Sequence, residues 1–278
     1  MQSPSALVIL ISGLLLSSCV SQEAPASGAA TTMGQRINLT QDAKQKIGRK
    51  IWLNESSGTV EGLTSWNKNE YFASLGIGHF IWYTAKKPGP FDESWPKLIA
   101  FMKQRNVAMP EWIATTKDCP WNSYEEFHAA KNSAMMNELR GFLKHTIDVQ
   151  TDFIVHRLQS ALPKMKAQAA NTAAERSKLE RNFYAVASSP QGVYALIDYV
   201  NFKGEGIKPE ERYKGQGWGL AQVLLEMEGQ PNGVAASVEF GNSAKRVLTR
   251  RVENAKPKDE SMWLRGWSNR SETYKKPL

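Results

Sequence analysis

The chain has 278 residues, 41% hydrophobic and 22% charged, a composition typical of a folded protein with room for one large domain or two small ones. Its 35 Lys and Arg exceed its 27 Asp and Glu, giving a formal net charge of +8. Such a field favours an anionic partner: a membrane surface, a cell-wall polymer or a nucleic acid. The basic residues are spread along the chain, so we expect no nucleic-acid-binding arm and no nucleic-acid partner.

The first nineteen residues differ from the rest. Residues 6–16 are an uninterrupted apolar run, too short to span a bilayer but typical of the hydrophobic region of a signal peptide. The run ends in Leu16-Ser17-Ser18-Cys19, which resembles the lipobox of bacterial lipoproteins, although no Lys or Arg precedes it. The resemblance implies a lipid on Cys19 and a membrane-anchored, exported protein facing the periplasm. A cleaved signal peptide without lipid and a chance apolar N-terminus are the alternatives.

The cysteine count agrees with this interpretation. If Cys19 is lipidated, Cys119 has no partner for a disulfide, so the fold must depend on its hydrophobic core. Residues 20–37 are rich in Ser, Ala, Gly, Pro and Thr and predict a flexible tether. We expect the folded domain over residues 38–278.

The first predicted helix runs from Gln41 to about Asn54, with Thr40 as its N-cap. Ala43, Ile47 and Ile51 are spaced four residues apart and therefore lie on one face of this helix. Glu55 is the next residue of the series and lies on the same face. A carboxyl group at the end of a buried helix face loses solvation. This favours the protonated form that a general acid requires.

The elements that follow are mainly helical. Residues 56–83 combine regularly spaced Gly with β-branched and aromatic residues, a pattern that predicts turns and short strands. The later predictions are a helix at 95–104, mostly helix over 123–187 with breaks near Gly141 and Pro163, a helix after Ser189-Pro190, a Gly-rich loop over 203–219, and helices starting near Pro231 and Trp263. The sequence therefore predicts an α+β fold, predominantly helical, with a small β element near its start.

Four segments resemble the lysozyme-like superfamily. Residues 74–79, SLGIGH, are similar to the hairpin end T-[IV]-G-[IW]-G-H of phage-type lysozymes, and Asn54-Glu55-Ser56 resembles the start of lytic transglycosylase sites. Residues 195–204 are similar to a helix end of phage-type lysozymes, and residues 266–272 to a C-terminal helix of that family and of chitosanases. The resemblance implies a lysozyme-like fold with a small β-hairpin, in which residues 84–190 are a possible helical insertion.

The resemblance implies that Glu55 is the general acid that cleaves β-1,4 glycosidic bonds of peptidoglycan, in a muramidase-type hydrolase or a lytic transglycosylase. Ser74 takes the place of the hairpin Thr that positions the attacking water. The Asp of phage-type enzymes falls on Thr64, so Glu70 is the nearest substitute, with Glu61 as a weaker candidate. Because transglycosylases need no second carboxylate, the product stays open.

Further residues are candidates for glycan contact. Tyr199 and Asn201 lie in the matching helix end, and Trp218 and Gln222 lie in a segment that resembles the G-L-M-Q segment of transglycosylases, but at another place in chain order. All four also have an ordinary structural interpretation, and His79 fits a packed histidine better than a base. A metal site is conceivable on one helix face, but a solvated polar face is the simpler interpretation of His145, Asp148, Asp152 and His156.

Two alternatives to peptidoglycan cleavage remain. The missing Asp suggests a non-catalytic cell-wall-binding lipoprotein, and the chitosanase-like C-terminus suggests hydrolysis of another amino sugar polymer. We expect no metal and no cofactor, a monomer, peptidoglycan strands as the partner, and membrane attachment through Cys19.

Overall fold

The computed structural model describes residues 35–87 and 89–278, and residues 36–278 form one compact unit. The apolar run, the lipobox-like segment with Cys19 and nearly all of the expected tether lie outside the described residues. In the described part of the chain, no helix combines the length and the apolarity that crossing a bilayer would require.

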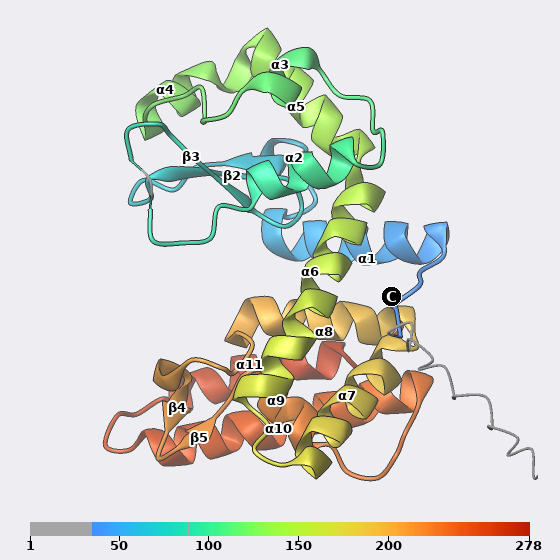
Figure 1. Cartoon of the computed structure of the whole chain (residues 1–278). Coiled ribbons are helices and arrows are strands. Elements are labelled where there is room, and N and C mark those ends of the chain that lie inside the picture. The colour runs from blue at the N-terminus through green and yellow to red at the C-terminus, as the bar shows by residue number, and fades with distance from the viewer. Residues whose placement is uncertain (1–34, 88) are drawn as a thin grey trace, which may run out of the picture. The chain divides into compact units, whose positions relative to one another are not determined.

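The described residues are predominantly helical, with a small antiparallel sheet near the start of the folded part, as the sequence predicts (Figure 1). The helices are α1 (Gln41–Ser56), α2 (Trp95–Lys103), α3 (Glu111–Thr115), α4 (Tyr124–Ala129), α5 (Ala134–His145), α6 (Ile147–Gln168), α7 (Ala173–Ala187), α8 (Pro190–Lys203), α9 (Leu220–Glu226), α10 (Gly233–Ala255) and α11 (Ser261–Thr273). The strands are β1 (Thr64–Ser65), β2 (Phe72–Leu75) and β3 (Phe80–Tyr83) in one sheet, and β4 (Arg212–Tyr213) and β5 (Gln216–Gly217) in another.

Local signals set several helix starts where the sequence predicts them. The Thr40 hydroxyl accepts a hydrogen bond from the Ala43 N–H and caps α1, and Ser189 caps α8 in the same way ahead of Pro190. The expected breaks at Gly141 and Pro163 are wrong, because Gly141 lies inside α5 and Pro163 inside α6. The real breaks precede α5, α6 and α7, and side chains cap two of these starts, Ser133 at α5 and Thr172 at α7.

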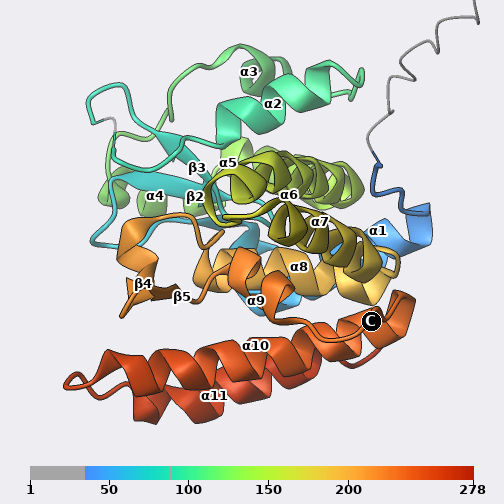
Figure 2. The ribbon, with the colours of Figure 1, turned by 60° about the horizontal axis from the view of Figure 1, so that its bottom comes forward.

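Helix α6 connects two groups of elements within this unit, with the three-stranded sheet and α2–α5 toward one end and α7–α11 toward the other (Figure 1). Helix α1 packs against both α6 and α8, and α10 and α11 lie side by side (Figure 2). Residues 84–190, the possible insertion, supply α2 to α7 and contribute to the same hydrophobic core as the rest. Cys119 is buried in this core, and burial raises the pKa of its thiol to about 12.

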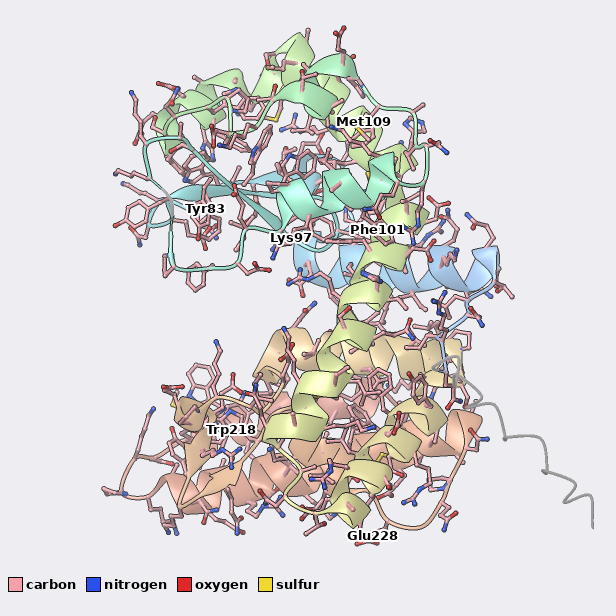
Figure 3. The ribbon with its side chains drawn as sticks, viewed as in Figure 1. Tyr83, Lys97, Phe101, Met109, Trp218 and Glu228 are labelled. Atoms are coloured by element: carbon pink, nitrogen blue, oxygen red, sulfur yellow. The ribbon has the colours of Figure 1, made fainter. Side chains whose placement is uncertain are left out.

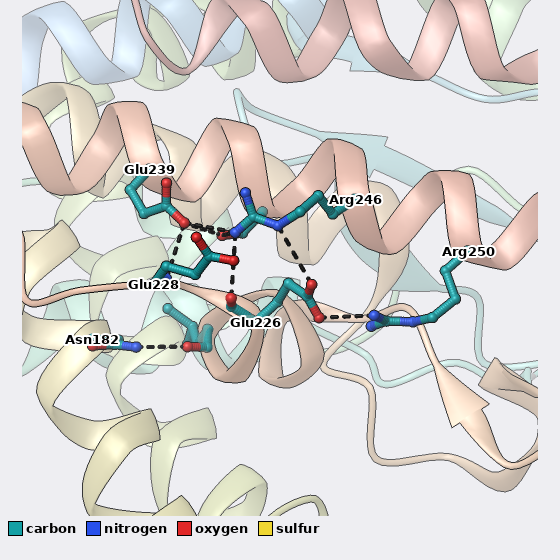
Figure 4. Close-up of polar contacts among 8 residues, drawn as sticks. Asn182, Glu226, Glu228, Glu239, Arg246 and Arg250 are labelled. Atoms are coloured by element: carbon teal, nitrogen blue, oxygen red, sulfur yellow. Dashed lines mark hydrogen bonds and ion pairs between the residues drawn. The ribbon is translucent and has the colours of Figure 1, made fainter.

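A polar cluster joins the later helices (Figure 4). Arg246 of α10 donates to Glu239 at 2.7 Å, and Arg250, one turn further on, donates to Glu226 of α9 at 2.8 Å. The Asn182 side chain of α7 donates to the Leu224 carbonyl at 2.8 Å. These contacts fix α9 between α7 and α10, and none of them faces the sheet.

Gln150 of α6 holds the turn between β2 and β3. Its side chain is fully buried, its Oε1 accepts from the Ile77 N–H at 3.0 Å, and its Nε2 donates to the Leu143 carbonyl at 2.7 Å. Gly76 in this turn has φ +68, and a Cβ there would lie 2.3 Å from Gln150 Oε1, so the turn requires glycine. One amide side chain therefore ties the hairpin to the junction of α5 and α6.

We expect Gln150→Leu to lower the free energy of unfolding by roughly 2–4 kcal/mol, because it leaves the Ile77 N–H and the Leu143 carbonyl buried without this partner. Urea unfolding of the variant measures the loss. Gln168→Leu, at an exposed position at the end of the same helix, is the control and should change stability by less than about 0.5 kcal/mol. Equal stability of the two variants would contradict the role of Gln150.

Candidate active site

Glu55 lies in the last turn of α1, beside the turn between β2 and β3. Its side chain is 31% exposed, and its Oε2 is 3.9 Å from Nδ1 of His79. The other ring nitrogen of His79 is 3.4 Å from the Ser56 hydroxyl. His79 has φ 46, a left-handed conformation that places its ring toward the end of α1. Glu55 is thus half-buried rather than buried, and among the described residues His79 is its one ion-pair partner within 4.0 Å when the imidazole is protonated.

A buried acidic residue of α8 anchors this end of α1. Asp198 is 4% exposed and accepts from Arg270 Nε at 2.7 Å, from Arg270 Nη2 at 2.8 Å and from the Tyr274 hydroxyl at 2.7 Å. The Asn54 side chain, next to Glu55 in the sequence, donates to the Tyr194 hydroxyl at 2.7 Å and lies 3.4 Å from Asp198. The carboxylate of Asp198 therefore joins α1, α8 and α11 at the residue that precedes Glu55.

The charges in this network act on one another. Burial, followed by the nearby charge of Asp198, raises the pKa of Tyr194 to about 12, so its hydroxyl stays protonated. Burial lowers the pKa of Arg270, but the hydrogen bonds and charge of Asp198 outweigh it, with smaller contributions from Tyr274 and Glu55, and the net shift is upward. Arg270 is thus a permanent positive charge close enough to Glu55 to feel its carboxylate.

Glu70 does not join Glu55. It lies in the turn between β1 and β2, whereas Glu55 lies beside the turn at the other end of β2. A four-residue strand spans about 13 Å, so the two turns are well separated. One oxygen of the Glu70 carboxylate is buried without a hydrogen-bond partner. No second carboxylate forms a hydrogen bond or ion pair with Glu55 in the ranges that the structure describes.

Ser74 and Thr64 both lie in the three-stranded sheet. Thr64 is the position at which phage-type lysozymes have an Asp. Ser74 is 7% exposed in the middle of β2, where it pairs with Ser65 and Ile81. Thr64 is 6% exposed, and its hydroxyl accepts from Arg140 Nε at 2.8 Å. Neither the Ser74 nor the Thr64 side chain forms a hydrogen bond with Glu55 in the structure.

The predicted glycan-contact residues differ in position. Tyr199 is fully buried and donates to the Trp218 carbonyl at 2.8 Å, so the expected glycan contact does not fit this position. Gln222 accepts from the Gly219 N–H and donates to the Gly206 carbonyl, both at 3.0 Å, which closes the Gly-rich loop. Trp218 is 7% exposed and stacks on Tyr213 at 4.6 Å between ring centroids. Of these four predicted residues, only Asn201 is exposed.

A groove of about 830 Å³ lies beside this region, and Asn201 is part of it. Glu55 is not among its lining residues, but Gly78, next to His79, is. The opposite wall comes from α2 with Lys97 and Phe101 (Figure 3), and α6 contributes Ile154 and Arg157. The groove therefore reaches the hairpin turn that carries His79, and both charged and aromatic side chains line it.

Near the C-terminal end of α8, two cationic side chains lie over aromatic rings. Lys203 Nζ is 3.6 Å from the centroid of the Trp267 ring and 4.0 Å from that of Phe202. Arg251 lies over Trp218 at 4.0 Å and over Trp267 at 4.8 Å. Trp218 is one of the predicted glycan-contact residues. Lys203, Arg251 and Trp267 were not singled out, because they come from α8, α10 and α11, which are far apart in the sequence.

The four residues considered for a metal site are engaged elsewhere. Asp148 accepts from Gln41 at 2.6 Å, Asp152 pairs with Lys44 at 2.8 Å, and His145 contacts the Gly141 carbonyl. His156 lies beside the Phe101 ring. No group of three or more potential metal ligands occurs within residues 35–87 and 89–278.

Comparison of the chain with protein-family models, with curated proteins and with solved structures gave no significant match. The chemistry of the site is therefore inferred from its own geometry.

We expect Asp198→Asn to lower the free energy of unfolding by roughly 2–4 kcal/mol, because Arg270 then loses its counter-charge in a half-buried position. Urea unfolding measures this change. Asp152→Asn removes a carboxylate from an ion pair that is more exposed, and it should cost less than about 1 kcal/mol. If both variants lose the same small amount, Asp198 does not anchor the site.

Lys203 gives a prediction about pH. Burial, followed by the charge of Arg251, lowers the pKa of its amine from 10.5 to about 7, with Arg270 adding to the shift and Glu260 opposing it. Between these pH values the unfolded chain binds more protons than the folded one, so the contribution of Lys203 to stability rises with pH. Lys203→Met should therefore stabilise the protein at pH 6, and the gain should shrink by pH 9. Thermal unfolding at both pH values tests this, and an equal gain at both would contradict it.

Proposed function

We propose that this chain cleaves β-1,4 glycosidic bonds of peptidoglycan on a lysozyme-like fold, with Glu55 as the general acid. The observation that carries the proposal is the half-buried carboxyl group at the end of α1, beside the SLGIGH turn and above the Asp198–Arg270 pair. A predominantly helical chain with two small antiparallel sheets is consistent with this fold. The four sequence segments that resemble the superfamily motivate the substrate.

The chemistry follows from the position of the carboxyl group. In its protonated form Glu55 donates a proton to the oxygen of the glycosidic bond, which then breaks as positive charge develops on the sugar ring. The resulting carboxylate lies opposite that charge and stabilises it. In the second half of the reaction the Glu55 carboxylate accepts the proton of the attacking water or substrate hydroxyl, which restores the acid.

The fate of the sugar cation depends on a second group. A hydrolase uses a carboxylate to activate water, whereas a transglycosylase uses a hydroxyl of the substrate itself, which adds to the cation and closes a ring. Glu70 lies at the far end of β2, and Thr64 occupies the position of the family's Asp. This placement favours the ring-closing reaction and an anhydro product.

The setting of the reaction is also a proposal. The lipobox-like segment at Cys19 supports export and a lipid anchor, which would hold the domain next to peptidoglycan on the periplasmic side. The net charge of +8 suits an anionic polymer or membrane surface.

The purified protein, incubated with isolated cell-wall sacculi, should release soluble muropeptides, and Glu55→Gln should reduce the rate at least about 100-fold. Glu111→Gln is the matched control, because Glu111 is an exposed carboxylate at the start of α3. Unchanged release by Glu55→Gln would overturn the proposal.

The same experiment separates the alternatives. Mass spectrometry of the products distinguishes reducing ends, which require an activated water, from anhydro ends. Sacculus binding without any release would instead indicate a non-catalytic cell-wall-binding protein. Cleavage of chitosan oligomers but not of sacculi would assign the same site to another amino sugar polymer.

A further inference from the structure

One face of α11 carries aromatic rings that lead toward Glu55. Trp263, Trp267 and Arg270 are spaced four and three residues apart, so they lie on the same side of the helix. Trp263 is 55% exposed, and Trp267 is partly exposed one turn further along, about 6 Å away along the helix axis. The exposed ring of Trp263 is a suitable platform for the apolar face of a sugar ring, whereas the ring of Trp267 carries the Lys203 amine. We call Trp263, Trp267 and Arg270, with Lys203 on top of Trp267, the α11 strip.

One cation of the α11 strip has no acidic partner in the part of the chain that the structure describes. Arg270 pairs with Asp198 at 2.7 Å, and the neighbouring Arg251 pairs with Glu260 at 2.7 Å. Lys203, between them, has no ion pair within 4.0 Å among the described residues. Its amine instead rests on the faces of Trp267 and Phe202. A third positive charge is thus held close to two others without an anion of its own.

Holding the Lys203 amine in this position has an energetic cost. Desolvation and the neighbouring arginines favour the neutral amine, as the lowered pKa of about 7 shows. The cation–aromatic contacts offset part of this cost. An incoming carboxylate would supply the missing counter-charge and a charge-assisted hydrogen bond in a partly desolvated position.

We propose that the α11 strip binds the glycan strand and selects strands that carry carboxylate groups, with the Lys203 amine as the ligand of the carboxylate. The inference rests on the proposed function and names the substrate class of that site as an acidic amino sugar polymer. Trp263 contacts a sugar ring regardless of charge, Trp267 supports the Lys203 amine, and Lys203 distinguishes an acidic strand from a neutral one. The carboxylate belongs either to a lactyl ether on the sugar or to a peptide attached to it.

The test measures binding, so it does not depend on turnover. The full chain carrying Glu55→Gln is titrated by calorimetry with three oligosaccharides of equal length: a neutral chitin oligomer, a glycan with lactyl carboxylates, and the same glycan with peptide stems. We expect one or both acidic ligands to bind more tightly than the chitin oligomer. The acidic ligand that binds more tightly identifies the source of the carboxylate.

In the same background, Lys203→Met should weaken binding of the preferred acidic ligand roughly 10- to 100-fold and leave the chitin oligomer unchanged. Lys203→Arg should retain most of the preference, and Trp263→Ala should weaken all three ligands. Lys144→Met, which removes an exposed lysine on α5, is the matched control and should change none of them.

Three results would overturn the inference: an equal effect of Lys203→Met on acidic and neutral glycans, no effect on either, or no binding of any glycan. If Lys203→Met weakens the affinity for single-stranded DNA but leaves glycan binding unchanged, Lys203 belongs to a general polyanion site, and this result would also overturn the inference. Release of muropeptides by the unsubstituted protein is measured separately. The proposed function can therefore stand when charge selection fails.

Discussion

The buried carboxylate of Asp198 is the contact on which the arrangement around Glu55 depends. It is 4% exposed, and an unpaired charge in such a position would cost several kcal/mol. Arg270 and Tyr274 must therefore be in place before the network is stable. They are 72 and 76 residues away in the sequence, so the end of α1 is anchored only when the last helix has docked. The first and last helices of the described chain are thereby joined through α8.

The sequence predicted the helical elements better than the contacts between them. Thr40 and the spacing of Ala43, Ile47 and Ile51 located α1, because capping and burial of one face are local properties. Pro163 was misinterpreted as a break, since α6 continues through it despite the missing backbone donor. The predominance of helix was thus predictable, whereas helix ends inside a long helical stretch were not.

The candidate site was predictable only in part. Glu55 could be chosen from its helix position, but its neighbour His79 depends on the register of β2 against β3, which one sequence does not specify. On α8 the sequence pointed to Tyr199, while the contacts to α1 and α11 beside Glu55 are made by Asp198, one residue earlier and about 100° around the helix. A pattern of residue types cannot resolve a single step around a helix whose sides are nearly all buried.

Cys119 has a consequence for the compartments in which this domain can fold. With a pKa of about 12 and a buried side chain, its thiol is almost entirely protonated near neutral pH, and the thiolate is the form that reacts with oxidants or disulfides. The described domain contains no cystine, and its one thiol is protected by the core that surrounds it. Its folded state should therefore be insensitive to redox potential, equally stable in a reducing cell interior and in an oxidising cell envelope.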